Sequence, residues 1–141
     1  MQLIKMKRII LLISFALFRG LSYSQDCSKI RTGKFYFYPR NSYASYTYLL
    51  VRGDSIQQEI NYLLKDTSYW RIMFENPCTF NLNFLRSTEE MPEGKIRFFK
   101  DHHTHIKVLT VTDNYYTYHW SLDSLPTKTQ GEDTVWIKPK N

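Results

Sequence analysis

An alternation of apolar and polar residues on both sides of Asn76-Pro77 constrains the fold of this chain most strongly. Apolar side chains occupy every second position, first before this dipeptide and then after it: Trp70, Ile72, Phe74, Cys78, Phe80, Leu82 and Phe84. A period of two residues is typical of a β-strand with one buried face, and proline interrupts a strand because it has no backbone N–H to donate. Residues 68–85 are therefore predicted to form a β-hairpin with one apolar face.

Similar alternation elsewhere predicts a series of short strands separated by turn residues. The other expected strands lie near 34–38, 46–51, 55–64, 95–112, 115–122 and 133–138. The tract 95–112 is expected either to turn at 101–104 or to form one bent strand. The segment 123–132 is expected to be a loop that has room for a short helical turn. No segment shows a convincing helical period.

The strand expected at 55–64 alternates most cleanly. One face carries Ile56, Gln58, Ile60, Tyr62 and Leu64, and the other carries Ser55, Gln57, Glu59 and Asn61. This pattern is typical of an antiparallel strand with one face toward solvent. The fold class is therefore predicted to be all-β, an antiparallel meander of eight or nine strands. We favour a small lipocalin-like barrel over a sandwich.

The first residues are predicted to be a signal peptide. A basic start with Lys5, Lys7 and Arg8 precedes an apolar run at 9–18. The segment 22–24 then offers small residues before the expected cut. This order is typical of a signal peptide, and we place the cleavage after Ser24. The apolar run is shorter than the roughly 20 residues that span a bilayer. We therefore expect 1–24 to be removed, 25–141 to form a single β-domain, and no transmembrane segment to remain.

The net charge changes once the predicted signal peptide is set aside. The full chain has 19 Lys and Arg residues, 13 Asp and Glu residues and a net charge of +6. Four of the basic residues and none of the acidic residues precede residue 26, which leaves 15 against 13 and a net charge of +2. A nucleic-acid-binding domain is expected to keep a basic patch. We therefore expect no nucleic-acid partner.

Two cysteines remain in the predicted mature chain, Cys27 and Cys78. Exported proteins meet an oxidising environment in which disulfides form and persist, so a Cys27–Cys78 disulfide is predicted. The alternative is two free, buried thiols. Redox catalysis is not expected, because the chain has no Cys-x-x-Cys motif.

Four short motifs together resemble a group of small exported proteins typical of Bacteroidota. They are CSKIRTGKF at 27–35, RGDSIQ at 52–57, WRIMFENPC at 70–78 and VWIK at 135–138. The group shares a C-x5-G-x-F start, an R-[NG]-D-S-I hairpin and a W-x7-C hairpin, and the resemblance covers essentially the whole mature chain. It implies export, and it carries no catalytic residue to this chain. The name DNA topoisomerase IV, which some members bear, does not suit a small, nearly neutral exported domain without a carboxylate cluster for metal.

Asp101-His102-His103-Thr104-His105 is the sharpest candidate for a metal site. On an extended strand, Asp101, His103 and His105 would point to one face, and two imidazoles with a carboxylate suit Zn²⁺ or a similar ion. A fourth ligand, for which His119 is the candidate, would complete the site. The alternative is a solvated polar turn between two strands.

Arg52-Gly53-Asp54-Ser55 matches an integrin-type adhesion tetrapeptide. The same residues stand where a tight hairpin turn favours Gly-Asp. We prefer the turn and keep adhesion as a weaker hypothesis.

Tyrosines gather in the first and the late strands, and the chain has 11 of them. If the sheet closes, these strands become neighbours and the tyrosines could line a cavity that binds a flat ligand. The candidate ligand-binding residues are Tyr36, Tyr38, Tyr46, Tyr48, Tyr116 and Tyr118. The alternative is that they pack the core and form cross-strand pairs.

No spacing in the sequence pairs a nucleophile with a base, and no Gly-rich phosphate loop or G-x-S-x-G motif is present. We therefore expect neither enzymatic activity nor a cofactor. The first hypothesis is an exported domain, in the periplasm, on the cell surface or in the medium. It binds a small apolar or aromatic-compatible ligand or serves as an envelope-associated module. The others are a metal-dependent activity at Asp101, His103 and His105, and a protein-interaction or adhesion module.

Overall fold

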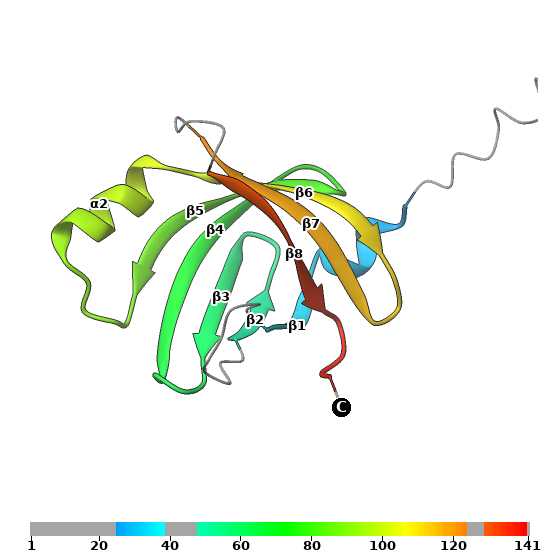
Figure 1. Ribbon diagram of the computed structural model, residues 1–141, viewed down its shortest axis with the longest axis horizontal. Coiled ribbons are helices and arrows are strands. Elements are labelled where there is room, and N and C mark those ends of the chain that lie inside the picture. Colours follow the sequence, from blue (N-terminus) through cyan, green and yellow to red (C-terminus); the bar gives the residue numbers. More distant parts are fainter. Residues whose placement is uncertain (1–24, 39–47, 124–128, 141) are drawn as a thin grey trace, which may run out of the picture.

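The computed structural model describes residues 25–38, 48–123 and 129–140 and shows an antiparallel β-barrel (Figure 1). Eight strands pair in sequence order, and the last closes on the first. The strands are β1 Gly33–Phe37, β2 Tyr48–Arg52, β3 Ile56–Asn61, β4 Asp66–Asn76, β5 Thr79–Ser87, β6 Thr104–Val111, β7 Tyr115–Leu122 and β8 Gln130–Trp136. Closure is made by Tyr36 opposite Trp136 and Phe37 opposite Val135. The predicted all-β barrel is confirmed, whereas the predicted signal peptide lies outside the described residues.

One end of the barrel is covered by a short 3-10 helix, η1 (Cys27–Ile30). Asp26 caps this helix by accepting a hydrogen bond from the backbone N–H of Ser28 at 3.0 Å. The side chains of Cys27 and Ile30 are almost completely buried. A disulfide joins Cys27 to Cys78 in the β4–β5 turn, which confirms the predicted pairing. The segment before β1 therefore closes the barrel at the end where the β2–β3, β4–β5 and β6–β7 turns lie.

The tract 95–112 is not one β-rich segment, because its first part is helix α2 (Glu93–Asp101). The expectation of a β-rich tract over 95–112 is thus wrong for its first part, although the sequence shows no convincing helical period there. Ile96 and Phe99 are the partly buried residues of this helix, and their spacing of three places them on one helical face. Arg97 pairs with Glu93 at 3.0 Å, an i,i+4 pair that supports the helix modestly. Figure 1 shows α2 outside the barrel, beside β5.

Strand β3 presents its polar face, not its apolar face, to the barrel interior. Gln57 and Asn61 are each 2% exposed, whereas Ile56 is 36% exposed. The expected alternation is correct as far as Asn61, after which Tyr62 and Leu64 belong to a turn. Strand alternation determines which residues share a face, but it does not determine which face points inward. The barrel interior therefore contains buried polar side chains from β3 in addition to its hydrophobic core.

The predicted hairpin at 68–85 is confirmed as β4 and β5, with Pro77 and Cys78 in the turn between them. Its inward residues Ile72, Phe80 and Leu82 belong to the hydrophobic core. The other buried members of the core are Cys27, Ile30, Phe35, Leu50, Ile106, Val108, Tyr116 and Val135. Most of these residues lie toward the η1 end of their strands. Side chains therefore fill the half of the barrel nearest η1.

Gly131 allows β8 to pass directly beneath the ring of Trp120, its partner across the β7–β8 ladder. A Cβ atom on Gly131 would lie 3.0 Å from Nε1 of Trp120. We expect Gly131→Ala to displace this ring and to lower the free energy of unfolding by about 1–3 kcal/mol, the usual cost of overpacking. Urea denaturation measures the change. Gly94→Ala in α2 is the matched control, because no atom lies within 4 Å of its added Cβ; a loss of stability in the control alone would contradict this account.

Within the described ranges, no helix is long and apolar enough to cross a membrane.

Candidate functional site

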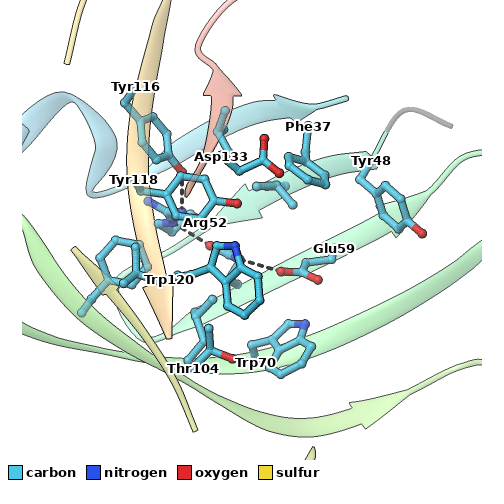
Figure 2. Close-up of a pocket in the computed structure, with 16 residues that line it drawn as sticks. Phe37, Tyr48, Arg52, Glu59, Trp70, Thr104, Tyr116, Tyr118, Trp120 and Asp133 are labelled. Atoms are coloured by element: carbon cyan, nitrogen blue, oxygen red, sulfur yellow. Dashed lines mark hydrogen bonds between the residues drawn. The ribbon is translucent and has the colours of Figure 1, made fainter. Parts of the chain in front are cut away.

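The barrel contains a cavity of about 520 Å³ (Figure 2), which extends from Arg52, next to η1, toward the opposite end of the barrel. It is lined by Phe37, Tyr48, Leu50, Arg52, Gln57, Glu59, Trp70, Phe80, Leu82, Thr104, Ile106, Tyr116, Tyr118, Trp120, Asp133 and Val135. These residues come from every strand of the barrel. Tyr48 and Thr104 are the first residues of β2 and β6, so the cavity reaches the strand ends opposite η1. Its volume is within the usual range for a small-molecule site.

Seven of the sixteen described residues that line the cavity carry aromatic rings. The ring of Trp70 meets Phe84 edge-on at 5.3 Å between centroids and Phe99 of α2 at 5.8 Å. Helix α2 therefore supports the wall from outside by holding the indole of Trp70 in place. On the opposite wall, Tyr118 packs at 6.0 Å from Tyr116. Flat rings fixed in this way are suited to stack on a flat ligand.

Arg52 forms the floor of the cavity, and its side chain is almost fully buried at 4% exposure. Its Nη1 donates to the backbone oxygen of Ile30 at 2.6 Å, which joins the floor to η1. Its Nη2 donates to the hydroxyl of Tyr116 at 2.9 Å, and its Nε donates to Oε1 of Gln57 at 2.8 Å. The guanidinium also lies over the ring of Phe80, 4.7 Å from its centroid. A buried charge is tolerated when its donors are satisfied in this way.

The hydrogen-bond network continues from Arg52 up the cavity wall to Glu59. Gln57 accepts from Arg52 and donates through Nε2 to Oε1 of Glu59 at 2.9 Å. Burial raises the pKa of the Glu59 carboxyl, while the Gln57 hydrogen bond, the indole of Trp70 and the charge of Arg52 act in the opposite direction. Glu59 keeps some accessible surface because it faces the cavity.

Tyr118 lies at mid-depth between the acidic groups of the cavity, as Figure 2 shows. Burial raises the pKa of its hydroxyl, and Tyr116, Asp133 and Glu59 raise it further. Its phenol therefore stays protonated at any physiological pH and can donate a hydrogen bond.

We expect Glu59→Gln to raise the melting temperature at neutral pH. The folded-state pKa of Glu59 is raised above its ordinary value of 4.5, so ionisation of Glu59 costs stability as the pH rises through the folded pKa. The glutamine removes this cost and keeps an acceptor for Gln57. The increase in melting temperature should therefore become smaller as the pH falls from neutral to 4.5. Each kcal/mol of unfolding free energy corresponds to roughly 4–8 °C in melting temperature.

Thermal unfolding followed by circular dichroism across this pH range measures the effect. Glu132→Gln, on the exposed face of β8, is the matched control. A difference from wild type that grows on acidification would contradict the raised pKa of Glu59.

The structure separates the six tyrosines predicted to bind a ligand. Tyr48, Tyr116 and Tyr118 line the cavity. Tyr36 and Tyr38 are outside this lining, and the hydroxyl of Tyr38 instead accepts a hydrogen bond from the backbone of Lys140 at 3.1 Å. Tyr46 lies outside the described residues.

The predicted metal site rests on a strand that the structure does not contain. Asp101 is the last residue of α2, so it does not continue the β6 face that carries His105. Nδ1 of His105 instead lies 2.9 Å from Oδ1 of Asn81, and the backbone N–H of His103 donates to Asp123 at 2.7 Å. Across residues 25–38, 48–123 and 129–140, no three His, Cys, Asp or Glu side chains are grouped to hold a metal ion, and His119 joins no such group.

The Arg52–Ser55 segment is a hairpin connection, as preferred above. The backbone N–H of Gly53 donates to the oxygen of Ile56 at 2.9 Å. Arg52 points into the barrel, so the surface does not present the tetrapeptide as a unit. This geometry argues against adhesion through Arg52 and Asp54.

Sequence reasoning missed the polar side of the cavity. The alternation puts Gln57 and Glu59 on one face of their strand, but it does not indicate that this face is the inner one. The available signal was barrel closure itself. In a closed barrel every strand turns one of its two faces inward, so the polar face of β3 is a candidate inner face, opposite Tyr116, Tyr118 and Trp120.

In comparisons with protein-family models, curated proteins and solved structures, the chain matched none. The fold and the cavity thus define a closed eight-stranded β-barrel with an internal pocket.

Proposed function

We propose that this protein is an exported, non-enzymatic domain that binds one small, largely aromatic or apolar ligand inside its barrel. The cavity of about 520 Å³ is the observation that carries the proposal. Apolar walls with a few converging polar groups are the usual composition of a small-molecule site. Here the walls are rings such as Trp70 and Trp120, and the polar groups include Glu59, Tyr118 and Asp133.

The cavity is too large to be an ordinary packing defect. Protein interiors are close-packed, and voids much larger than a water molecule are few. At the η1 end of this barrel, side chains that do not line the cavity, such as Ile30, Phe35 and Val108, pack in this normal way. The chain can therefore fill a barrel interior, and the volume that stays open supports a binding role.

Export is the second part of the proposal. The Cys27–Cys78 disulfide is of the kind that persists in an oxidising compartment. The apolar run at 9–18 after a basic start supports the same conclusion from the sequence. The domain would then meet its ligand in the periplasm, at the cell surface or in the medium.

A cavity-blocking variant tests the proposal with 2-naphthol as a neutral, flat probe. Thr104 lines the cavity, whereas Thr110 on the same strand is exposed, so Thr104→Trp and Thr110→Trp make the same change on opposite faces. In calorimetric titrations we expect the probe to bind wild type and Thr110→Trp alike, and to bind Thr104→Trp at least about tenfold more weakly, a loss of roughly 1.4 kcal/mol. Failure of 2-naphthol to bind wild type, or equal binding to both variants, would overturn the proposal.

A further inference from the structure

The charged groups that line the cavity differ in what they present to a ligand. Among the described residues that line the cavity, Arg52 is basic and Glu59 and Asp133 are acidic. Figure 2 shows the two acidic side chains within the cavity, from β3 and β8, with the hydroxyl end of Tyr118 between them. A ligand at mid-depth therefore meets carboxyl groups from two sides of the barrel.

The basic group is shielded from the same position. The guanidinium of Arg52 is committed to Ile30, Gln57 and Tyr116 through three hydrogen bonds. The rings of Phe35 and Phe80 cover it, with centroids at 5.0 Å and 4.7 Å from its central carbon. Its exposure of 4% leaves little surface on which an anionic group could be recognised. The floor therefore does not cancel the acidic character of the middle of the cavity.

The aromatic wall favours the same sign of ligand charge. The faces of tryptophan and tyrosine rings attract ammonium groups, most strongly where water is excluded. Trp70, Trp120 and Tyr118 surround the position that Glu59 faces. A site in which aromatic rings surround an acidic group is suited to bind an organic cation.

We propose that the ligand is a small aromatic amine, or a similar organic cation, whose charged nitrogen is bound by Glu59 with Asp133 while its flat body lies among the aromatic walls. This inference rests on the proposed function of the barrel and names the ligand class of the same cavity. The carboxyl of Glu59 is already oriented, because Nε2 of Gln57 donates a hydrogen bond to its Oε1 at 2.9 Å. A charge-assisted hydrogen bond to such an oriented group is stronger than a neutral one.

Two matched sets of probes test the ligand class by isothermal titration calorimetry at neutral pH. The first set is tryptamine, tryptophol and indole-3-propionate, and the second is 2-phenylethylamine, 2-phenylethanol and 3-phenylpropionate. Within each set the ring is the same and only the polar end changes. We expect each amine to bind about 10- to 100-fold more tightly than the acid of its set, the range for a hydrogen bond to a charged group.

The variants assign the effect to the carboxyl groups. Glu59→Gln keeps the shape of the side chain and is expected to weaken amine binding about tenfold or more, and Asp133→Asn is expected to weaken it in the same direction. Glu132→Gln, beside Asp133 but on the outer face of β8, should leave amine affinity unchanged. Circular dichroism and binding of 2-naphthol, which has no cationic group, show whether each variant keeps its fold and its cavity.

Three results would overturn the inference: an alcohol or acid that binds as tightly as its amine, amine affinity that Glu59→Gln leaves unchanged, or no binding of any member of either set. In each case, the proposed function would still be supported if 2-naphthol binds the wild type and Thr104→Trp weakens that binding. Loss of that 2-naphthol binding as well would overturn both.

Discussion

Arg52→Met is expected to lower the free energy of unfolding by about 3 kcal/mol or more, because it leaves three buried acceptors unsatisfied at about 1–3 kcal/mol each. Methionine replaces most of the apolar stem but none of the three donated hydrogen bonds. Gln57, Tyr116 and the backbone oxygen of Ile30 would each lose a donor in a buried environment. Each unsatisfied group adds to the loss. Urea denaturation at neutral pH measures it.

A second variant separates the network from simple packing. Arg52→Met combined with Gln57→Leu removes a stranded acceptor, and replacing buried polar partners together is often far less costly than removing one. We therefore expect the double variant to recover part of the loss. Arg71→Met, on the exposed face of β4, is the control and should change stability by about 0.5 kcal/mol at most. A cost for Arg52→Met no larger than that of the control would refute the structural role of the floor.

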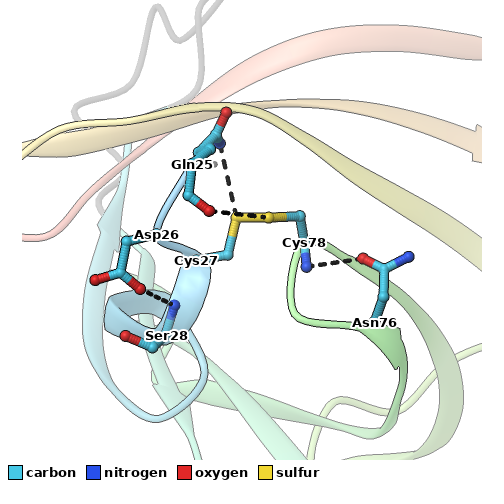
Figure 3. The surroundings of a disulfide bond; sticks show 6 residues. All are labelled: Gln25, Asp26, Cys27, Ser28, Asn76 and Cys78. Carbon is cyan, nitrogen blue, oxygen red and sulfur yellow. Dashed lines mark hydrogen bonds between the residues drawn. A yellow bond between two sulfur atoms is a disulfide. The ribbon is translucent and has the colours of Figure 1, made fainter. Parts of the chain in front are cut away.

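The Cys27→Ser, Cys78→Ser double variant is expected to lose about 4 kcal/mol of unfolding free energy in the chain-entropy description of disulfides. The bond joins residues 51 positions apart and holds η1 against the β4–β5 turn, as Figure 3 shows. Without it, the unfolded chain gains freedom and the cover of the barrel end is tied by weaker contacts. These include the ion pair of Lys29 with Asp113 at 2.7 Å, whose two side chains are largely exposed.

Reduction of the wild-type protein provides the matched comparison for this prediction. The reduced protein and the serine variant should unfold at the same urea concentration, because both lack the crosslink. Lys29→Ala should cost less than about 1 kcal/mol, as expected for an exposed ion pair. A serine variant as stable as the oxidised protein would show that the disulfide does not secure the barrel end.

The barrel could be predicted from sequence because its main signals are local. Alternation around Asn76-Pro77 identified the central hairpin, and turn residues divided the remaining strands. Cys27 and Cys78 could be paired because only two cysteines follow the predicted signal peptide. Strand number and chain order then favoured a meander that closes on itself.

Helix α2 was missed because Ile96 and Phe98 fit a period of two. The face that packs on the barrel is instead marked by Ile96 and Phe99, and Pro92 followed by Glu93 is a typical helix start. The error carried over to the metal hypothesis, because Asp101 was placed on a strand with His103 and His105. A short helix between two strands leaves only a weak periodic signal.

The cavity could be predicted only in part, since which face of a strand turns inward depends on the whole barrel. The aromatic side was anticipated through Tyr48, Tyr116 and Tyr118. The polar side was not, because Gln57 and Glu59 have the composition of a solvated face. Barrel closure places them opposite the tyrosines and builds the network from Arg52 to Glu59.

Native mass spectrometry of the protein purified without denaturation from the cells that make it tests the central claim most directly. The account predicts a reproducible added mass of small-molecule size that is released on denaturation. The same mass should remain on Thr110→Trp, where the exposed face is changed, and be absent from Thr104→Trp, where the cavity is blocked. A bare polypeptide for the wild type, or an added mass that both variants retain equally, would contradict the claim that the barrel binds a ligand in its interior.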